Sequence, residues 1–208
     1  MSLKDIAAVA LFAALTAALG LVPVIPLPVI GVTFSLQTIG VILAGGILGP
    51  RRGAMAMGLL ILLVALGLPV LTGGQGGIAK LIGVTAGFIW SWPLAAAITG
   101  WLTQAFWHRL NSLLAFVASL AGGVSMYLLG QIILAAETGL PASTAAWTWL
   151  IYLPGDIIKA IAAAGAIVTV KRAYPLIEPR SVINPRNPSS GVANHAGTTA
   201  NHPMIVKN

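Results

Sequence analysis

The sequence contains no cysteine, and only four of its 208 residues are acidic. The absence of cysteine excludes disulfide scaffolds, catalytic thiolates and cysteine-ligated metal sites. With so few carboxylates, acid–base catalysis by paired Asp and Glu is not expected. The sequence also lacks the Gly-x-x-x-x-Gly-Lys-Ser/Thr run of P-loop ATPases, the His-Glu-x-x-His pair of zinc proteases and the Gly-x-Ser-x-Gly turn of serine hydrolases. We therefore expect no enzyme active site, no metal site and no ATP hydrolysis in this chain.

Charge is also scarce. Only 7% of the residues are charged, whereas 58% are hydrophobic, and the mean hydropathy is +0.95. Soluble domains carry about 25% charged residues, because their surface must be solvated by water. The net charge of +7 does not indicate a nucleic-acid partner, since the basic residues stand at the ends of apolar runs and not among aromatic residues on a polar segment. The composition predicts an integral membrane protein that a lipid bilayer surrounds.

Six apolar segments predict an all-α fold, a bundle of six transmembrane helices. A helix needs about 20 apolar residues to cross the hydrocarbon core, although a shorter span suffices where neighbouring helices bury its ends. A longer polar loop is predicted over residues 138–146, before the last span. The predicted spans are residues 6–22, 36–48, 54–68, 84–105, 112–136 and 150–170.

The two parts of the chain differ in composition. Residues 1–172 hold all six apolar segments and form the predicted membrane domain, whereas residues 173–208 are rich in Pro, Asn, Ser and Gly, which predicts a polar, disordered tail. If the N-terminus lies inside, six spans return the C-terminus inside, and most of the eleven Lys and Arg residues then fall on that side. This positive-inside bias predicts that both termini are cytoplasmic, and we expect the protein in the cytoplasmic membrane.

Three polar features meet on the predicted outer side of the membrane. They are a glycine-rich loop over residues 73–77 with Gln75 at its centre, Lys80, and the pair Asp156 and Lys159 at the start of the sixth span. Asp156 and Lys159 are three residues apart, so they share one helix face. The helix start also favours an ionised Asp156. Charges inside a span are costly and usually face a cavity, which favours a site in which Asp156 accepts from ligand N–H groups and Lys159 donates to a ligand oxygen.

Each of these features has a simpler alternative. Asp156 and Lys159 could form a self-neutralising ion pair at the interface, and the loop over residues 73–77 could be a flexible connector. On the first span, Ala10, Ala14 and Ala18 repeat every four residues. Small residues at this spacing let another helix come close. Packing inside the bundle is the simpler interpretation, and a docking face for another membrane subunit is the alternative.

Four stretches of the sequence, taken together and in this order, resemble the BioY family. This family consists of biotin-binding substrate-specificity (S) components of energy-coupling-factor (ECF) vitamin transporters, and the resemblance covers residues 1–172. The stretches are residues 32–38 (VTFSLQT), 43–53 (LAGGILGPRRG), 67–77 (GLPVLTGGQGG) and 153–159 (LPGDIIK).

The resemblance implies an S-component fold that binds biotin near the outer face. It implies that Gln75, Asp156 and Lys159 hold the bicyclic head group, with Phe88 as a further ligand-binding residue. It also implies docking onto a transmembrane coupling subunit through Ala10 and Ala14, with ATP hydrolysis in separate ATPase subunits and no cofactor in this chain. Self-association is a further arrangement that the sequence leaves open.

The chain departs from the family pattern in three places, one of which is that the prolines usually found near the fourth span are displaced to Pro93. Gln75 stands where a shorter Asn or Ser is common, and the motif at residues 83–88 (GVTAGF) lacks the usual proline and one glycine, so that Phe88 keeps a ring without a hydroxyl. These departures leave two alternatives to biotin uptake open. One is an S component for a different vitamin or a biotin analogue, and the other is a membrane structural or assembly protein that binds no small molecule.

Overall fold

The computed structural model describes residues 1–22, 25–26, 33–139 and 141–173, with only the backbone described at 25–26, 33–34 and 142–151. The predicted tail beyond residue 173 lies outside these ranges. The described part of the chain is mainly helical, which agrees with the predicted all-α fold. In chain order the elements are α1 (Leu3–Gly20), β1 (Ile25–Pro26), β2 (Thr33–Phe34), α2 (Gln37–Leu48), α3 (Pro50–Ala65), α4 (Ala79–Ile82), α5 (Ala86–Ala105), η1 (Trp107–Arg109), α6 (Ser112–Thr138) and α7 (Ala142–Ala173).

In the part of the chain that the structure describes, six helices of 12 or more residues overlap the six segments that the sequence predicts. Among the described residues, α1, α6 and residues Tyr152–Ala173 of α7 are long and apolar enough to cross a bilayer on their own, and α2 is a shorter apolar helix. Short strands β1 and β2 pair antiparallel, with Ile25 opposite Phe34. They occupy the proline-containing connection between α1 and α2.

The predicted polar loop over residues 138–146 is wrong in extent, because α7 already begins at Ala142. Pro141 directly precedes this helix, and proline is well tolerated at a helix start because the first N–H groups have no intrahelical acceptor. Pro154 lies inside α7 without ending it. Asp156 therefore lies in the interior of a long helix and not near its start, so the expected effect of the helix N-terminus on its charge does not apply.

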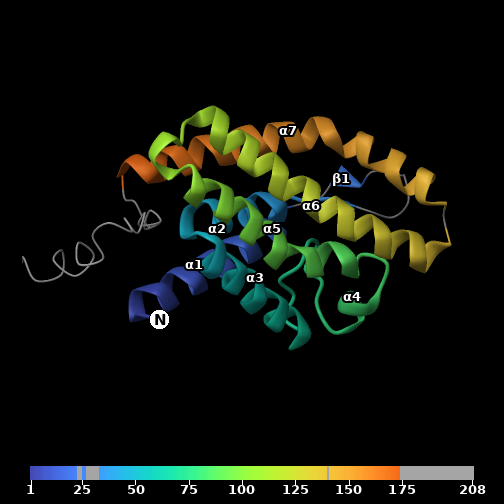
Figure 1. Cartoon of the computed structure of the whole chain (residues 1–208). Coiled ribbons are helices and arrows are strands. Elements are labelled where there is room, and N and C mark those ends of the chain that lie inside the picture. The colour runs from blue at the N-terminus through green and yellow to red at the C-terminus, as the bar shows by residue number, and fades with distance from the viewer. Residues whose placement is uncertain (23–24, 27–32, 140, 174–208) are drawn as a thin grey trace, which may run out of the picture.

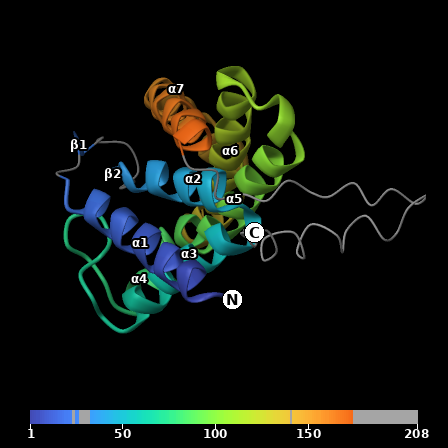
Figure 2. The same cartoon turned by 90° about the vertical axis from the view of Figure 1, so that its left-hand side faces the viewer.

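Helix α2 lies at the centre of the bundle. It packs against α1 and α3 on one side and against α5, α6 and α7 on the other, an arrangement that Figure 2 shows along the bundle. In Figure 1, α6 and α7 run side by side, and α5 packs against α6 as well as against α2 and α3. The contact of α2 with α5 is close, because a Cβ built on Gly45 would lie 2.1 Å from the backbone oxygen of Ala96. A glycine is required wherever two helix backbones approach this closely.

The first helix and the last helix both make polar contacts with neighbouring elements. Ser2 and Asp5 form a capping box at the start of α1, and Asp5 also pairs with Arg52 of α3 at 3.0 Å. At the other end, Lys171 of α7 donates to the carbonyl oxygens of Trp107 and Leu110, at 2.6 and 3.2 Å. The Lys171 ammonium also lies 5.3 Å from the centroid of the Trp107 ring. These contacts hold the last turn of α7 against the connection between α5 and α6.

We expect Lys171→Met to lower the free energy of unfolding by about 1–2 kcal/mol, because two carbonyl acceptors and a cation–π contact lose their partner. Thermal unfolding of the purified protein in detergent measures this. Arg172→Met is the matched control, since Arg172 is exposed at the neighbouring position. Equal changes in melting temperature for the two variants would show that the Lys171 contacts do not stabilise the fold.

Candidate ligand-binding site

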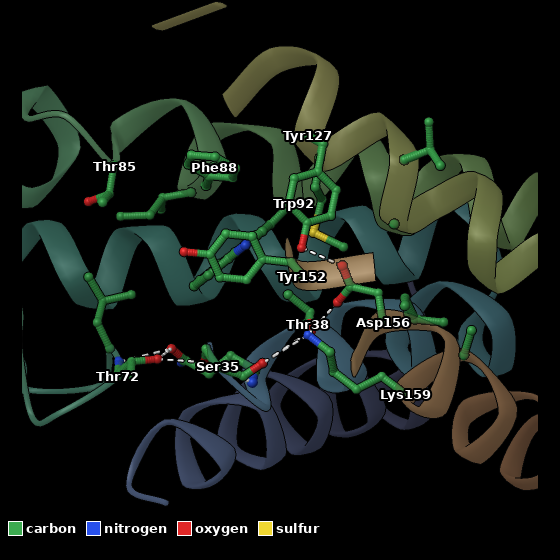
Figure 3. Close-up of a pocket in the computed structure, with 18 of the residues that line it drawn as sticks. Ser35, Thr38, Thr72, Thr85, Phe88, Trp92, Tyr127, Tyr152, Asp156 and Lys159 are labelled. Atoms are coloured by element: carbon green, nitrogen blue, oxygen red, sulfur yellow. Dashed lines mark hydrogen bonds and ion pairs between the residues drawn. The ribbon is translucent and has the colours of Figure 1, made fainter. Parts of the chain in front are cut away.

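A cavity of about 330 Å³ opens between α2, the loop after α3, and helices α5, α6 and α7. Its volume suits a small organic ligand. Figure 3 shows that polar groups from α2, the loop and α7 gather along one side of the cavity and aromatic rings along the other. The polar lining residues are Ser35, Gln37, Thr38, Thr72, Gln75, Lys80, Thr85, Ser119, Asp156 and Lys159, together with the hydroxyl groups of Tyr127 and Tyr152.

The charged pair of α7 lies in this lining. Lys159 Nζ is 2.6 Å from Asp156 Oδ1, and the side chains are only 6% and 16% exposed. Lys159 also donates to Thr38 Oγ1 at 3.0 Å and to the Ser35 carbonyl at 3.4 Å. The two charges therefore neutralise each other and also face the cavity. Since a buried pair in this setting is costly to form, its place at a cavity favours a role in ligand recognition over a purely structural one.

Tyr127 of α6 completes the surroundings of the carboxylate. Its hydroxyl donates to Asp156 Oδ2 at 2.5 Å, so each oxygen of Asp156 already accepts from one donor. A carboxylate oxygen has two lone-pair directions, and Asp156 thus keeps capacity for further N–H donors. Tyr127 thereby fixes where that remaining capacity points.

Aromatic rings form the opposite wall. Phe88 of α5 meets the Tyr127 ring edge to face, with centroids 6.0 Å apart and an interplanar angle of 81°. The ring centroids of Tyr127 and Tyr152 are 6.4 Å apart. Trp92 of α5 also lines the cavity (Figure 3). A Cβ on Gly130 of α6 would lie 2.3 Å from the Phe88 ring. Glycine at 130 thus leaves the space that the Phe88 ring occupies beside α6.

The glycine-rich loop has a defined conformation. Leu71 N donates to the Gln75 carbonyl at 2.9 Å, and the amides of Gly74 and Gln75 both donate to the Leu71 carbonyl, at 3.0 and 3.2 Å. Gly73 and Gly74 have φ of +74° and +69°, a conformation that side-chain-bearing residues rarely adopt. The loop is thus a tight hydrogen-bonded turn at the cavity mouth and not an unstructured connector.

The structure brings the predicted ligand-binding residues together. Gln75, Phe88, Asp156 and Lys159 come from three separate parts of the chain and line the same cavity. Lys80, singled out in the sequence as a basic residue on the predicted outer side, lines it as well. Polar residues that are far apart in the sequence thus line one cavity.

The alanines of the first span lie elsewhere. Ala10 and Ala14 are exposed on α1, whereas Ala13 beside them is buried. Neither Ala10 nor Ala14 belongs to the cavity lining. The interpretation that these two residues pack inside the bundle is therefore wrong, and a role in docking stays a prediction.

The sequence analysis did not predict several lining residues, chiefly Ser35, Thr38, Thr72 and Tyr127. Hydroxyl residues are common in membrane helices, so single ones give no signal. The stretches 32–38 and 67–77 do contain Ser35, Thr38 and Thr72, but nothing in the sequence says that these hydroxyl groups meet. Within the part of the chain that the structure describes, no group of three or more His, Asp or Glu residues could hold a metal ion.

Comparison with known proteins identifies the family. The model of the BioY family matches residues 1–176. A biotin transporter BioY of Rhizobium etli is 42% identical over 187 residues, which is 87% of this chain and 100% of that protein. A biotin transporter BioY of Rhodobacter capsulatus is 40% identical, covering 83% of this chain and 95% of that protein. A probable biotin transporter BioY of Bacillus subtilis is 37% identical, over 85% and 95% of the two chains.

A solved structure agrees with these relatives. The crystal structure of the S-component for biotin from an ECF-type ABC transporter superposes with a TM-score of 0.78, at 30% sequence identity. The match covers 83% of this chain and 95% of the other. The resemblance read from the four sequence stretches is thus confirmed by the family model, by the relatives and by the fold, and the chain belongs to the BioY family.

Proposed function

We propose that this protein is the biotin-binding S component of an ECF-type transporter and serves biotin uptake across the cytoplasmic membrane. The observation that carries the proposal is the Asp156–Lys159 pair, buried but facing a cavity of about 330 Å³ in a member of the BioY family. The relatives are named as transporters, and transport by such a component requires binding and release of the ligand without a chemical step. The chain is thus a transport component and not an enzyme.

The cavity chemistry suits a compact head group that carries both N–H donors and a carbonyl oxygen. In the proposed complex the ureido N–H groups of biotin donate to Asp156, and the ureido oxygen accepts from Lys159. Gln75 at the cavity mouth offers an amide that both donates and accepts. Phe88 provides an aromatic wall for the apolar part of the ring system. Each of these residues lines the cavity.

We further propose that all six long helices cross the membrane, with both termini in the cytoplasm. The position of most Lys and Arg residues at one end supports this orientation. Residues 1–172 then form the membrane domain, and residues 173–208 are a cytoplasmic tail. In this arrangement the exposed Ala10 and Ala14 contact a transmembrane coupling subunit, while ATPase subunits supply the energy. Self-association through the same face is the competing arrangement.

Binding of labelled biotin to the purified protein in detergent, followed by competition with a panel of vitamins, tests the ligand. We expect saturable binding with one site per chain, displaced by unlabelled biotin and not by riboflavin or thiamine. Dethiobiotin, which keeps the ureido group but lacks the sulfur ring, should compete more weakly, because it retains the polar contacts and loses apolar contact with the aromatic wall. If another vitamin displaces labelled biotin more strongly than unlabelled biotin does, that vitamin is the ligand. If no member of the panel binds, a structural role is favoured.

A further inference from the structure

The side chain of Gln37, at the start of α2, joins three segments that are far apart in the sequence. Its Nε2 donates to the Val70 carbonyl at 2.9 Å and to the Thr16 carbonyl of α1 at 3.2 Å. Its Oε1 accepts from the amide of Thr72 at 2.9 Å and from the Thr72 hydroxyl at 2.7 Å. Gln37 is 1% exposed. One buried amide therefore links α1, α2 and the loop that closes the cavity.

These four hydrogen bonds use the full capacity of the Gln37 side chain, which has two N–H donors and two lone pairs on its oxygen. The partners also fix the orientation of the amide, because two carbonyl oxygens require N–H donors and the Thr72 amide requires an acceptor. Gln37 has no donor or acceptor left for a ligand. Although it lies in the cavity lining, its contribution to binding must run through the residues that it holds.

The contacts continue from Gln37 to the charged pair. The Thr72 and Ser35 hydroxyl oxygens are 2.6 Å apart, and Ser35 Oγ accepts from the backbone N–H of Gln37 at 3.1 Å. The Ser35 carbonyl in turn accepts from Lys159. Figure 3 shows Thr72 and Ser35 in line with the Lys159 ammonium along one side of the cavity. The loop and the charged pair are thus placed by one continuous set of hydrogen bonds.

The loop has few other tethers to the helices. Gly73 N donates to the Gly20 carbonyl at the end of α1 at 3.2 Å, and Gly77 N donates to the Val64 carbonyl of α3 at 2.8 Å. Among the described residues, the other backbone–backbone hydrogen bonds of residues 71–75 are internal to the turn, and the Thr72 hydroxyl contacts Ser35. Loss of the Gln37 amide therefore removes the largest single connection between the turn that carries Gln75 and the helical bundle.

We propose that Gln37 is a positioning residue that holds the loop over residues 70–75 against the cavity and so sets the residence time of the bound ligand. The effect on the residence time of the ligand rests on the proposed biotin function. Without the Gln37 side chain, the loop keeps its internal turn and its contacts with Gly20 and Ser35 but is held less firmly, so that Gln75 and Thr72 leave the cavity more often.

The first test is amide hydrogen exchange on the ligand-free proteins. In Gln37→Met the Thr72 amide loses its acceptor, so the peptide that covers residues 68–78 should exchange at least about tenfold faster, while peptides from α6 exchange as in the unsubstituted protein. Gln104→Met makes the same chemical change on α5 outside the cavity lining and should leave the loop unchanged. Equal loop exchange in Gln37→Met and Gln104→Met would overturn the proposal.

The second test is the rate of biotin dissociation. Gln37→Met should release biotin about tenfold faster, with an association rate within about threefold of the original, because the loop acts after the ligand has entered. Thr72→Val removes only the hydroxyl and should give about a threefold increase. In the double variant the effects should combine to less than their product, because both changes remove the same contact. Thr169→Val, at an exposed position of α7, is the control for the threonine change.

The two tests separate the proposals. If the unsubstituted protein does not bind biotin, the proposed function fails, and ligand-free exchange still decides the role of Gln37. If Gln37→Met does not fold, Thr72→Val carries both measurements. Unchanged dissociation and unchanged loop exchange in Thr72→Val, with Gln37→Met either unfolded or equally unchanged, would reject the positioning role while leaving biotin binding intact.

Discussion

Replacing Asp156 by asparagine is expected to weaken biotin binding by at least about 100-fold. The carboxylate is the acceptor for Lys159 and Tyr127 and in the proposed complex also for the ligand N–H groups. An asparagine keeps the shape but removes the charge, and it turns one of the two acceptor atoms into a donor. That donor then faces either the Lys159 ammonium or the Tyr127 hydroxyl. Titration of biotin into the purified variant measures the change.

The same substitution also leaves the Lys159 charge buried without its counter-charge, a loss that typically costs about 3–5 kcal/mol. Thermal unfolding must therefore be measured beside binding, and affinity compared at a temperature where both proteins are folded. Glu137→Gln is the matched control, because it makes the same change at an exposed position of α6 outside the cavity lining. An affinity within about threefold of the original for Asp156→Asn would remove Asp156 from the site.

Gly45→Ala is expected to have the largest effect on folding. A methyl group at this position would lie 2.1 Å from the Ala96 carbonyl oxygen and 2.8 Å from its carbonyl carbon. These are backbone atoms, so no side chain can rotate away, and α2 and α5 must move apart. Since α2 lies at the centre of the bundle, we expect a loss of about 3 kcal/mol or more, above the usual cost of overpacking. Recovery of folded protein from the membrane and its melting temperature measure this loss.

Gly58→Ala provides the comparison for that prediction. Gly58 lies on α3 and has no atom within 4 Å of an added Cβ, so its replacement should be neutral or slightly stabilising, because alanine favours the helix over glycine. If Gly45→Ala and Gly58→Ala melt at the same temperature, the close contact between α2 and α5 does not limit stability.

The helices could be predicted from the sequence because apolar length is the dominant signal in a membrane protein. The predicted start of the second span at residue 36 lies one residue from the observed start of α2, and the end at residue 105 matches the end of α5. The start of the last helix was misplaced because its first residues are polar and look like a loop. The preceding Pro141 is compatible with a helix start, and hydropathy does not report such a signal.

The candidate site could be predicted only in part. Asp156 and Lys159 are conspicuous because charges are rare in apolar spans, and Gln75 is conspicuous as one amide among glycines. Tyr127, Thr72 and Gln37 could not be assigned roles, since their importance lies in contacts between segments separated by 29 to 37 positions in the chain. Such pairings depend on how the helices cross, which single-sequence periodicity does not specify.

The bond from Gln37 to the Thr16 carbonyl has a thermodynamic consequence for α1. The same helix is tied to the cavity loop on one side and exposes Ala10 and Ala14 on the other. If the loop closes over a ligand, the end of α1 is held more firmly. A protein that binds the exposed side of α1 then binds a more rigid helix, and its affinity for this chain changes. By linkage, any factor by which ligand changes the affinity for that partner is the factor by which the partner changes the affinity for ligand. A partner that displaces α1 would thus release the ligand without touching the cavity.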